Sequence, residues 1–254
     1  MLVQLPNGLL DGSDLFNYVE IDELRGKQQN YLADRELVVG NVGHIPKILT
    51  DLTLALQTKE GLKWGGNMED AIQKLPSGDL ETILLKIREK TYGDRFYFEA
   101  VCPHCEHKNK DLRINLNELE LDVMSLEKML DKSERVFKLP SGIECEIKPI
   151  FLRDIFEVIK ITKNKQNELI TSVLALSLKR LGDITKVTTD DVAKLSMKDI
   201  MSLKEKLEKV KLEGSIDTEI ETSCTSCGKD FSTKLDVFDP GFFDPSKGSM
   251  STPT

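Results

Sequence analysis

The sequence predicts an α+β protein made of two similar modules, each combining helices with a β-hairpin, that meet through their CxxC pairs. Three observations predict this: a Leu-Pro-x-Gly turn that occurs twice, two CxxC pairs of identical spacing, and apolar residues that follow helical or strand periods. The chain has 254 residues, 39% hydrophobic and 31% charged. This balance is typical of soluble globular proteins, and the length allows one large domain or two small ones.

The internal repeat is visible in the order of the motifs. The turn Leu5-Pro6-Asn7-Gly8 returns as Leu139-Pro140-Ser141-Gly142, and each copy precedes a short strand and several helical stretches. Each half then ends with a helix, a glycine, a strand, a CxxC pair and a further strand. The order of these features predicts a duplicated chain.

The duplication sets the expected domain limits. The first module covers residues 1–130 and ends in the first CxxC hairpin, and the second covers residues 131–246 and ends in the second. Residues 247–254 lack apolar anchors and are predicted to be a flexible tail.

Helical periodicity is clear in three places. One apolar stripe with i, i+3, i+4, i+7 spacing predicts a helix in each half: Leu80, Ile83, Leu84 and Ile87, then Leu152, Ile155, Phe156 and Ile159. Residues 170–181 leave little polar surface, which predicts a central, buried helix. Ser196 and Asp199 have the spacing of a capping box at the start of the last long helix.

Strand periodicity marks two further segments. Apolar or small residues alternate with charged ones, so that one face of each strand is expected in the core. The inward-facing sets are Ile143, Cys145 and Ile147, and Phe231, Thr233, Leu235 and Val237.

Charge and composition count against several functional classes. With 35 basic and 43 acidic residues the net charge is −8, without the basic stripe of a dedicated nucleic-acid binder. No apolar run approaches the ~18 residues that a membrane span needs, and the N-terminus lacks the basic residue of a secretory signal. No nucleotide-binding glycine motif or histidine-centred triad stands out. The sequence therefore predicts no catalytic residues and no enzyme.

Four of the five cysteines form two pairs, Cys102 with Cys105 and Cys224 with Cys227. In a reducing compartment such pairs are more often metal ligands than disulfides. The fifth, Cys145, lies on the apolar face of its strand and is predicted to be a buried structural thiol.

Each cysteine pair lies between two predicted strands, which is the arrangement of a zinc-ribbon knuckle. One knuckle supplies two thiolates, so a single structural zinc per chain, shared by Cys102, Cys105, Cys224 and Cys227, is the simplest complete site. Three alternatives stay open: two separate sites completed by His104 or His107, a ribbon that has lost its metal, and a redox pair. A redox pair requires CxxC at a helix N-terminus, whereas strand patterns follow both pairs here.

A family resemblance rests on these motifs taken in order. They are the helix that begins at Leu80, Tyr92-Gly93-Asp94, Cys102-Pro-His-Cys105 and Asn115-Leu116 in the first half, then Leu139-Pro-Ser-Gly142, Glu213-Gly214-Ser-Ile216, Cys224-Thr-Ser-Cys227-Gly228 and Phe242-Phe243 in the second. From Leu5 to Ser246 the chain resembles the baseplate hub subunit and hub-assembly chaperone family of contractile-tailed, T-even-like bacteriophages. Glu106 departs from the pattern, because a knuckle commonly has glycine there.

The resemblance implies a non-enzymatic structural or assembly protein of the tail baseplate hub, which contacts other baseplate and tail proteins. It implies a place in the host cytoplasm during assembly, or in the virion baseplate if the protein is retained, and it is compatible with a homo-oligomer. The alternative function is a zinc-ribbon regulator that binds nucleic acid or a polymerase. A metal or thiol enzyme is the third hypothesis, after the baseplate protein and the regulator.

Phe242 and Phe243 lie between prolines near the end of the second module. Successive side chains of an extended strand face opposite sides, so one ring is expected to pack on its own module while the other docks a baseplate partner. The alternative is that a bent backbone places both rings in a local groove.

Overall fold

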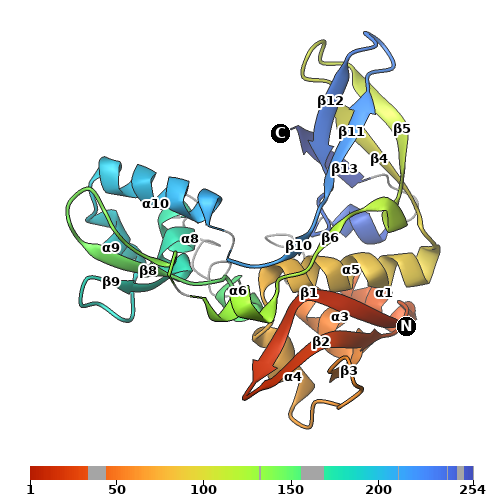
Figure 1. Ribbon diagram of the computed structural model, residues 1–254. Coiled ribbons are helices and arrows are strands. Elements are labelled where there is room, and N and C mark those ends of the chain that lie inside the picture. The colour runs from red at the N-terminus through yellow and green to blue at the C-terminus, as the bar shows by residue number, and fades with distance from the viewer. Residues whose placement is uncertain are drawn as a thin grey trace.

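The computed structural model describes residues 1–33, 44–131, 133–155, 169–210, 212–238, 240–244 and 249–253. These residues form a mixed helix and strand structure, as the sequence predicts, with two bodies that are visible side by side in Figure 1. The larger body carries both chain termini and the five-stranded sheet, and the smaller one is built from the middle of the chain.

Helix α5 (Ser77–Tyr92) is the centre of the larger body (Figure 1). The predicted stripe of Leu80, Ile83, Leu84 and Ile87 is fully buried, which confirms the helical prediction. Gly93, with φ 89°, ends the helix, and its N–H donates to the Glu89 carbonyl at 2.8 Å.

A three-stranded antiparallel sheet of order β1-β2-β3 packs against α5. Its strands are β1 (Leu2–Asp11), β2 (Asp14–Ile21) and β3 (Thr53–Gln57). The helices around it are α1 (Gly26–Ala33), α3 (Ile45–Leu52) and α4 (Met68–Gln73).

A five-stranded sheet of order β11-β12-β13-β4-β5 rises above α5 (Figure 1). Its strands are β4 (Arg95–Val101), β5 (Lys108–Asn115), β11 (Glu219–Ser223), β12 (Asp230–Lys234) and β13 (Ser249–Pro253). The two CxxC hairpins, β4–β5 and β11–β12, thus belong to one sheet.

The expectation of a flexible tail does not hold for β13. This strand pairs in parallel with β4 and antiparallel with β12, and so fills the space between the two hairpins. Open strand edges present unpaired N–H and C=O groups to any segment that reaches them. The composition of the tail carried no sign of this pairing.

The smaller body contains a second antiparallel meander of order β7-β8-β9. Its elements are β7 (Val136–Lys138), β8 (Glu144–Ile147), α8 (Leu169–Ser177), β9 (Leu178–Leu181), α9 (Thr189–Ala193) and α10 (Met197–Lys209). The predicted Ser196 cap of α10 is confirmed, because its side chain accepts from the Asp199 N–H.

The predicted buried helix over residues 170–181 is wrong in two respects. The helix ends at Ser177, and Leu178–Leu181 pairs with β8 as a strand. Ile170 and Val173 are 56% and 37% exposed, so α8 is only partly buried. A short apolar run suits a buried strand as well as a buried helix, and pairing with a distant strand decides between them. For the helix predicted from Leu152, residues 152–155 are helical, while Phe156 and Ile159 lie outside the described residues.

The expected module limits place a division at residue 130, but the hydrophobic cores do not divide there. The core of the larger body combines the first half with Ile216 of β10 (Ser215–Ile216) and with residues of the second CxxC hairpin, among them Ile220 and Phe231. The core of the smaller body runs from Leu139 to Val210. Strands β6 (Leu121–Asp122) and β10 pair where the chain leaves and re-enters the larger body.

The two Leu-Pro-x-Gly turns make the same kind of bond to a long helix. Asp79 in the first turn of α5 accepts from the N–H groups of Asn7 and Gly8, both at 2.8 Å. Asp199 in the first turn of α10 accepts from the N–H of Ser141 at 2.9 Å. Gly8 has φ 84°, and a Cβ there would lie 2.6 Å from the Phe16 carbonyl oxygen, so only glycine fits this position.

Candidate metal centre

The four paired cysteines meet at the tips of the two hairpins. Their Sγ atoms all lie within 4.8 Å of one another. Two of the sulfur pairs join different hairpins: Cys102 to Cys227 at 3.8 Å and Cys105 to Cys224 at 3.6 Å. A tetrahedral ion with metal–sulfur bonds of about 2.3 Å places its sulfurs about 3.8 Å apart. The cluster therefore has the shape and the donor set to hold one metal ion.

The two tips share one backbone geometry. In each, the first cysteine exchanges N–H and C=O bonds with the end of its turn, and an N–H inside the turn points at its sulfur. The bonds are Cys102 N to His107 O, Glu106 N to Cys102 O and His104 N to Cys102 Sγ, matched by Cys224 N to Lys229 O, Gly228 N to Cys224 O and Ser226 N to Cys224 Sγ. Each turn thus presents its two sulfurs toward the other hairpin.

Glu106 and Gly228 occupy the same place in the two turns and both have left-handed backbone, with φ of 58° and 70°. This conformation suits glycine and strains a residue that has a Cβ. The departure from the knuckle pattern at Glu106 therefore keeps the geometry of the turn.

Replacing Glu106 with glycine is expected to raise the free energy of unfolding by about 0.5–1 kcal/mol, because relief of the strain exceeds the added chain entropy. The measurement is denaturant unfolding of the metal-loaded protein. Gly228→Glu is the matched reverse change and should lower stability by a similar amount, since nothing lies within 4 Å of a Cβ there. Equal effects of the same sign would contradict the strain argument.

The thiols do not ionise alike. The N–H of Cys227, together with that of Ser226, lowers the pKa of Cys224 to about 6. The His107 N–H lowers the pKa of Cys105. Desolvation and the neighbouring cysteines have a larger, opposite effect and raise that pKa to about 12. One thiolate is therefore favoured, and further thiolates repel it unless a cation lies between them.

Asn109 joins the hairpins next to the cysteines. Its buried side-chain oxygen accepts from the N–H of Thr225 at 2.8 Å and from the Thr225 hydroxyl at 2.9 Å. Sequence reasoning missed this residue. The signal that could have found it is a polar residue near the start of the strand after the knuckle, at a position that the alternation of the strand turns inward.

The alternatives to a shared site differ in what they require. Among the described residues, the one group of three or more potential metal ligands in mutual reach is the four-cysteine cluster, without His104 or His107. The His104 ring instead lies 3.2 Å from the Asp230 carbonyl oxygen. Strands β5 and β12, not helices, follow the two pairs, which does not fit a thioredoxin-like redox site.

Cys145 is buried, as predicted, and burial raises its pKa to about 11. It lies in the core of the smaller body and is not part of the cluster. Its role is packing.

Phe242 and Phe243 are both buried, which corrects the expectation that one ring stays available to a partner. Their ring centroids lie 5.1 Å apart, and Phe242 also packs on Phe96 at 5.3 Å. The buried guanidinium of Arg88 donates from Nε to the Phe242 carbonyl at 2.8 Å. Residues 240–243 form a 3₁₀ helix rather than a strand, so both rings turn toward the core.

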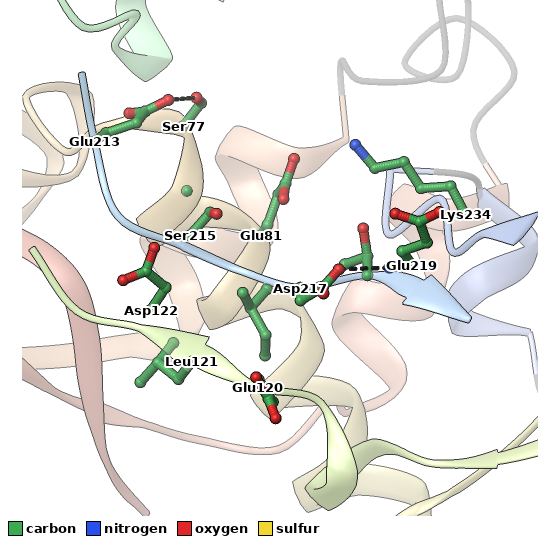
Figure 2. Close-up of a pocket in the computed structure, with 13 residues that line it drawn as sticks. Ser77, Glu81, Glu120, Leu121, Asp122, Glu213, Ser215, Asp217, Glu219 and Lys234 are labelled. Atoms are coloured by element: carbon green, nitrogen blue, oxygen red, sulfur yellow. Dashed lines mark hydrogen bonds between the residues drawn. The ribbon is translucent and has the colours of Figure 1, made fainter. Parts of the chain in front are cut away.

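An acidic pocket of about 760 Å³ lies below the sheet, between α5 and the β6–β10 pair. Its lining, drawn in Figure 2, includes six carboxylates and one amine: Glu81, Glu120, Asp122, Glu213, Asp217, Glu219 and Lys234. The Ser77 hydroxyl donates to Glu213, and burial raises the pKa of Glu213 to about 7.

This pKa predicts a pH dependence of folding. Between the ordinary value of 4.5 and about 7, folded Glu213 binds more protons than the unfolded chain, so its contribution to stability falls as pH rises through this window. Glu213→Gln is expected to flatten the fall in melting temperature between pH 4.5 and 7. Thermal unfolding at several pH values measures this, with exposed Glu60→Gln as the control. An unchanged slope would contradict it.

Comparison with known proteins identifies a family. A family model described as T4 bacteriophage base plate protein matches residues 53–243. None of the curated proteins and none of the solved structures matches the chain. Among the described residues no helix is long and apolar enough to cross a membrane. The matched range begins at β3, includes all four clustered cysteines and ends at Phe243, so the chain belongs to the T4 bacteriophage base plate protein family.

Proposed function

We propose that this protein is a non-enzymatic structural or assembly component of the phage baseplate hub, held together by one structural zinc. The observation that carries the proposal is the four-sulfur cluster, whose spacing matches a tetrahedral ion and whose members come from two hairpins with Cys105 and Cys224 119 positions apart in sequence. A metal there ties the two halves of a baseplate protein into one sheet.

The donor set favours a structural zinc. Catalytic zinc sites keep an open position beside three protein ligands, whereas four cysteines complete the tetrahedron. Four thiolates suit zinc or iron, and metal analysis distinguishes the two. The exposed Cys105 and Cys227 give an ion a path of entry from solvent.

We propose further that the chain arose by duplication. The matching bonds of the two cysteine turns support it, as do the two three-stranded meanders and the paired contacts of Asp79 and Asp199. In this view the second hairpin left its own module and completed the sheet of the first.

The family membership and the resemblance favour a hub subunit or a hub-assembly chaperone, with other baseplate and tail proteins as partners. A hub subunit is retained in the tail of the virion, and a chaperone acts in the host cytoplasm and is then released. Association of copies of this chain is compatible with either role.

Four measurements test the proposal and its alternatives. The purified protein is expected to contain one zinc per chain, and two zinc ions, or iron, would contradict the shared site. A phage lacking the gene is expected to build no baseplates until a plasmid copy is supplied. Normal baseplates without the gene would refute the assembly role, and a salt-dependent shift of DNA or RNA would favour the regulator instead. Mass spectrometry of purified virions then distinguishes a hub subunit from a chaperone.

A further inference from the structure

A groove of about 370 Å³ lies where the two bodies meet, and we call it the junction groove. Its apolar lining includes Leu9 and Leu10 of β1, Met129 of helix α6 (Leu126–Leu130) and Phe151. Helix α6 lies between the two bodies in Figure 1. Leu212 also lines the groove and packs against the core of the smaller body. We propose that the junction groove binds an acidic peptide segment with a large apolar side chain, supplied by another baseplate protein.

The charge of the groove supports an acidic occupant. Lys74, Arg135 and Arg153 line it, and no acidic side chain does. This contrasts with the net charge of −8 and with the acidic pocket beside α5. A cationic lining on an acidic protein favours anionic partners and disfavours a second acidic surface without complementary shape.

The nearby acids leave these cations largely unpaired. Asp154 pairs with Lys148 at 3.2 Å, whereas Arg153 is farther from it, at 3.9 Å. The Arg135 guanidinium donates to the Met129 carbonyl at 3.2 Å. Within the described residues no carboxylate lies within ion-pair distance of Lys74 or Arg135. The Ser133 N–H and, to a smaller extent, the charge of Arg135 lower the pKa of Asp131, so Asp131 lies near Arg135 without forming an ion pair with it. Neither Lys74 nor Arg135 therefore has an ion-paired carboxylate among the described residues.

The apolar lining indicates a peptide rather than a free anion. Leu9 is buried, while Leu10, Met129 and Phe151 are half-buried and offer aliphatic and aromatic surface beside the cations. A phosphate or a nucleic-acid backbone would use the charges and leave this surface in water. An acidic segment with one apolar anchor uses both.

The position of the groove indicates what binding would do. Residues 150–152 are bonded to the larger body by Ser77 N to Ile150 O at 3.0 Å and by Leu152 N to Leu75 O at 3.3 Å, and Leu152 lies in its core. Leu212, which also lines the groove, packs against the core of the smaller body. A segment that contacts Leu10 and Phe151 on one side and Leu212 on the other adds contacts across this junction. Binding should therefore fix the orientation of the bodies.

The inference rests on the proposed assembly role, and site-specific crosslinking in infected cells tests the two separately. A photo-reactive phenylalanine replaces Leu10 in a plasmid copy that complements the deletion phage, and Met197, exposed on α10, is the comparison position. The expected product at Leu10 joins this chain to an acidic, apolar-containing segment of one baseplate protein. Lys74→Glu with Arg153→Glu should lower its yield about tenfold or more. Lys198→Glu with Lys204→Glu, an equal charge change on exposed lysines of α10, should leave it unchanged.

Each outcome of the crosslinking experiment supports or overturns the inference. A Leu10 product with nucleic acid, with a second copy of this chain, or with a neutral or basic segment overturns the inference, as does the absence of a product there when baseplates depend on the gene. An equal loss of yield in both double variants also overturns it. Unchanged melting temperature and zinc content show that the variants are folded. Baseplates that form without the gene overturn the proposed function itself.

Discussion

Cys105→Ser is expected to abolish metal binding and to destabilise both hairpins, including the one more than a hundred residues away in sequence. The side chain of Cys105 is exposed and serine has nearly its shape, so little packing is lost. A structural zinc contributes on the order of 10 kcal/mol of apparent free energy, and this contribution is lost when the ion no longer binds. We therefore expect a loss of several kcal/mol in the free energy of unfolding.

Metal analysis and hydrogen exchange measure the two effects. Amides of β11 and β12 should lose protection together with those of β4 and β5, because one ion joins the hairpins. Cys145→Ala is the control and should cost about 1–2 kcal/mol of packing with the metal content unchanged. Exchange that increases in the first hairpin alone would contradict a shared site.

A double variant tests the sharing further. Once Cys105→Ser has removed the ion, Cys227→Ser on the other hairpin has no metal left to lose. The losses of the single variants should therefore fail to add, and the double variant should be about as stable as either. Additive losses would indicate two independent sites.

Asp79→Ala is expected to lower the free energy of unfolding by about 2–5 kcal/mol, because it leaves the buried N–H groups of Asn7 and Gly8 without an acceptor. The Asn7 side chain also donates to the Gly214 carbonyl at 3.0 Å and accepts from the Gly214 N–H. Loss of Asp79 therefore loosens a network that joins the first turn to the chain leaving the smaller body. Denaturant unfolding with metal present measures the change.

Asp199→Ala is the matched control, since Asp199 holds the equivalent turn through one backbone N–H, that of Ser141. Asp199→Ala should lower the free energy of unfolding less than Asp79→Ala does.

The effects of pH on the two aspartates should also have opposite signs. Burial raises the pKa of Asp79 to about 7, so its contribution falls as pH rises from 3.8 to 7. The Ser196 hydroxyl and the Ser141 N–H lower the pKa of Asp199, so its contribution is lost as pH falls. Equal losses and equal pH trends would contradict this account.

The sequence by itself determined the features that depend on neighbours along the chain. The spacing of Leu80, Ile83, Leu84 and Ile87 requires a helix with one buried face, and that face is buried. Alternation around Cys145 and Phe231 likewise predicted the buried sides of β8 and β12. The prediction is wrong for Ile143, which lies before β8 and is 36% exposed. The two CxxC spacings predicted hairpin tips with two sulfurs each, because such turns are local structures.

Only the tertiary structure decided where these local pieces meet. Leu178–Leu181 became a strand because it pairs with β8, and β13 formed because β4 and β12 present open edges to it. The bent backbone at Phe242 placed both rings in the core, and Asn109 gained its role only where the second hairpin arrived. These outcomes depend on contacts between residues far apart in sequence, whose free energy local periodicity does not contain. The junction groove belongs to the same class, since its walls come from two bodies that only the folded chain brings together.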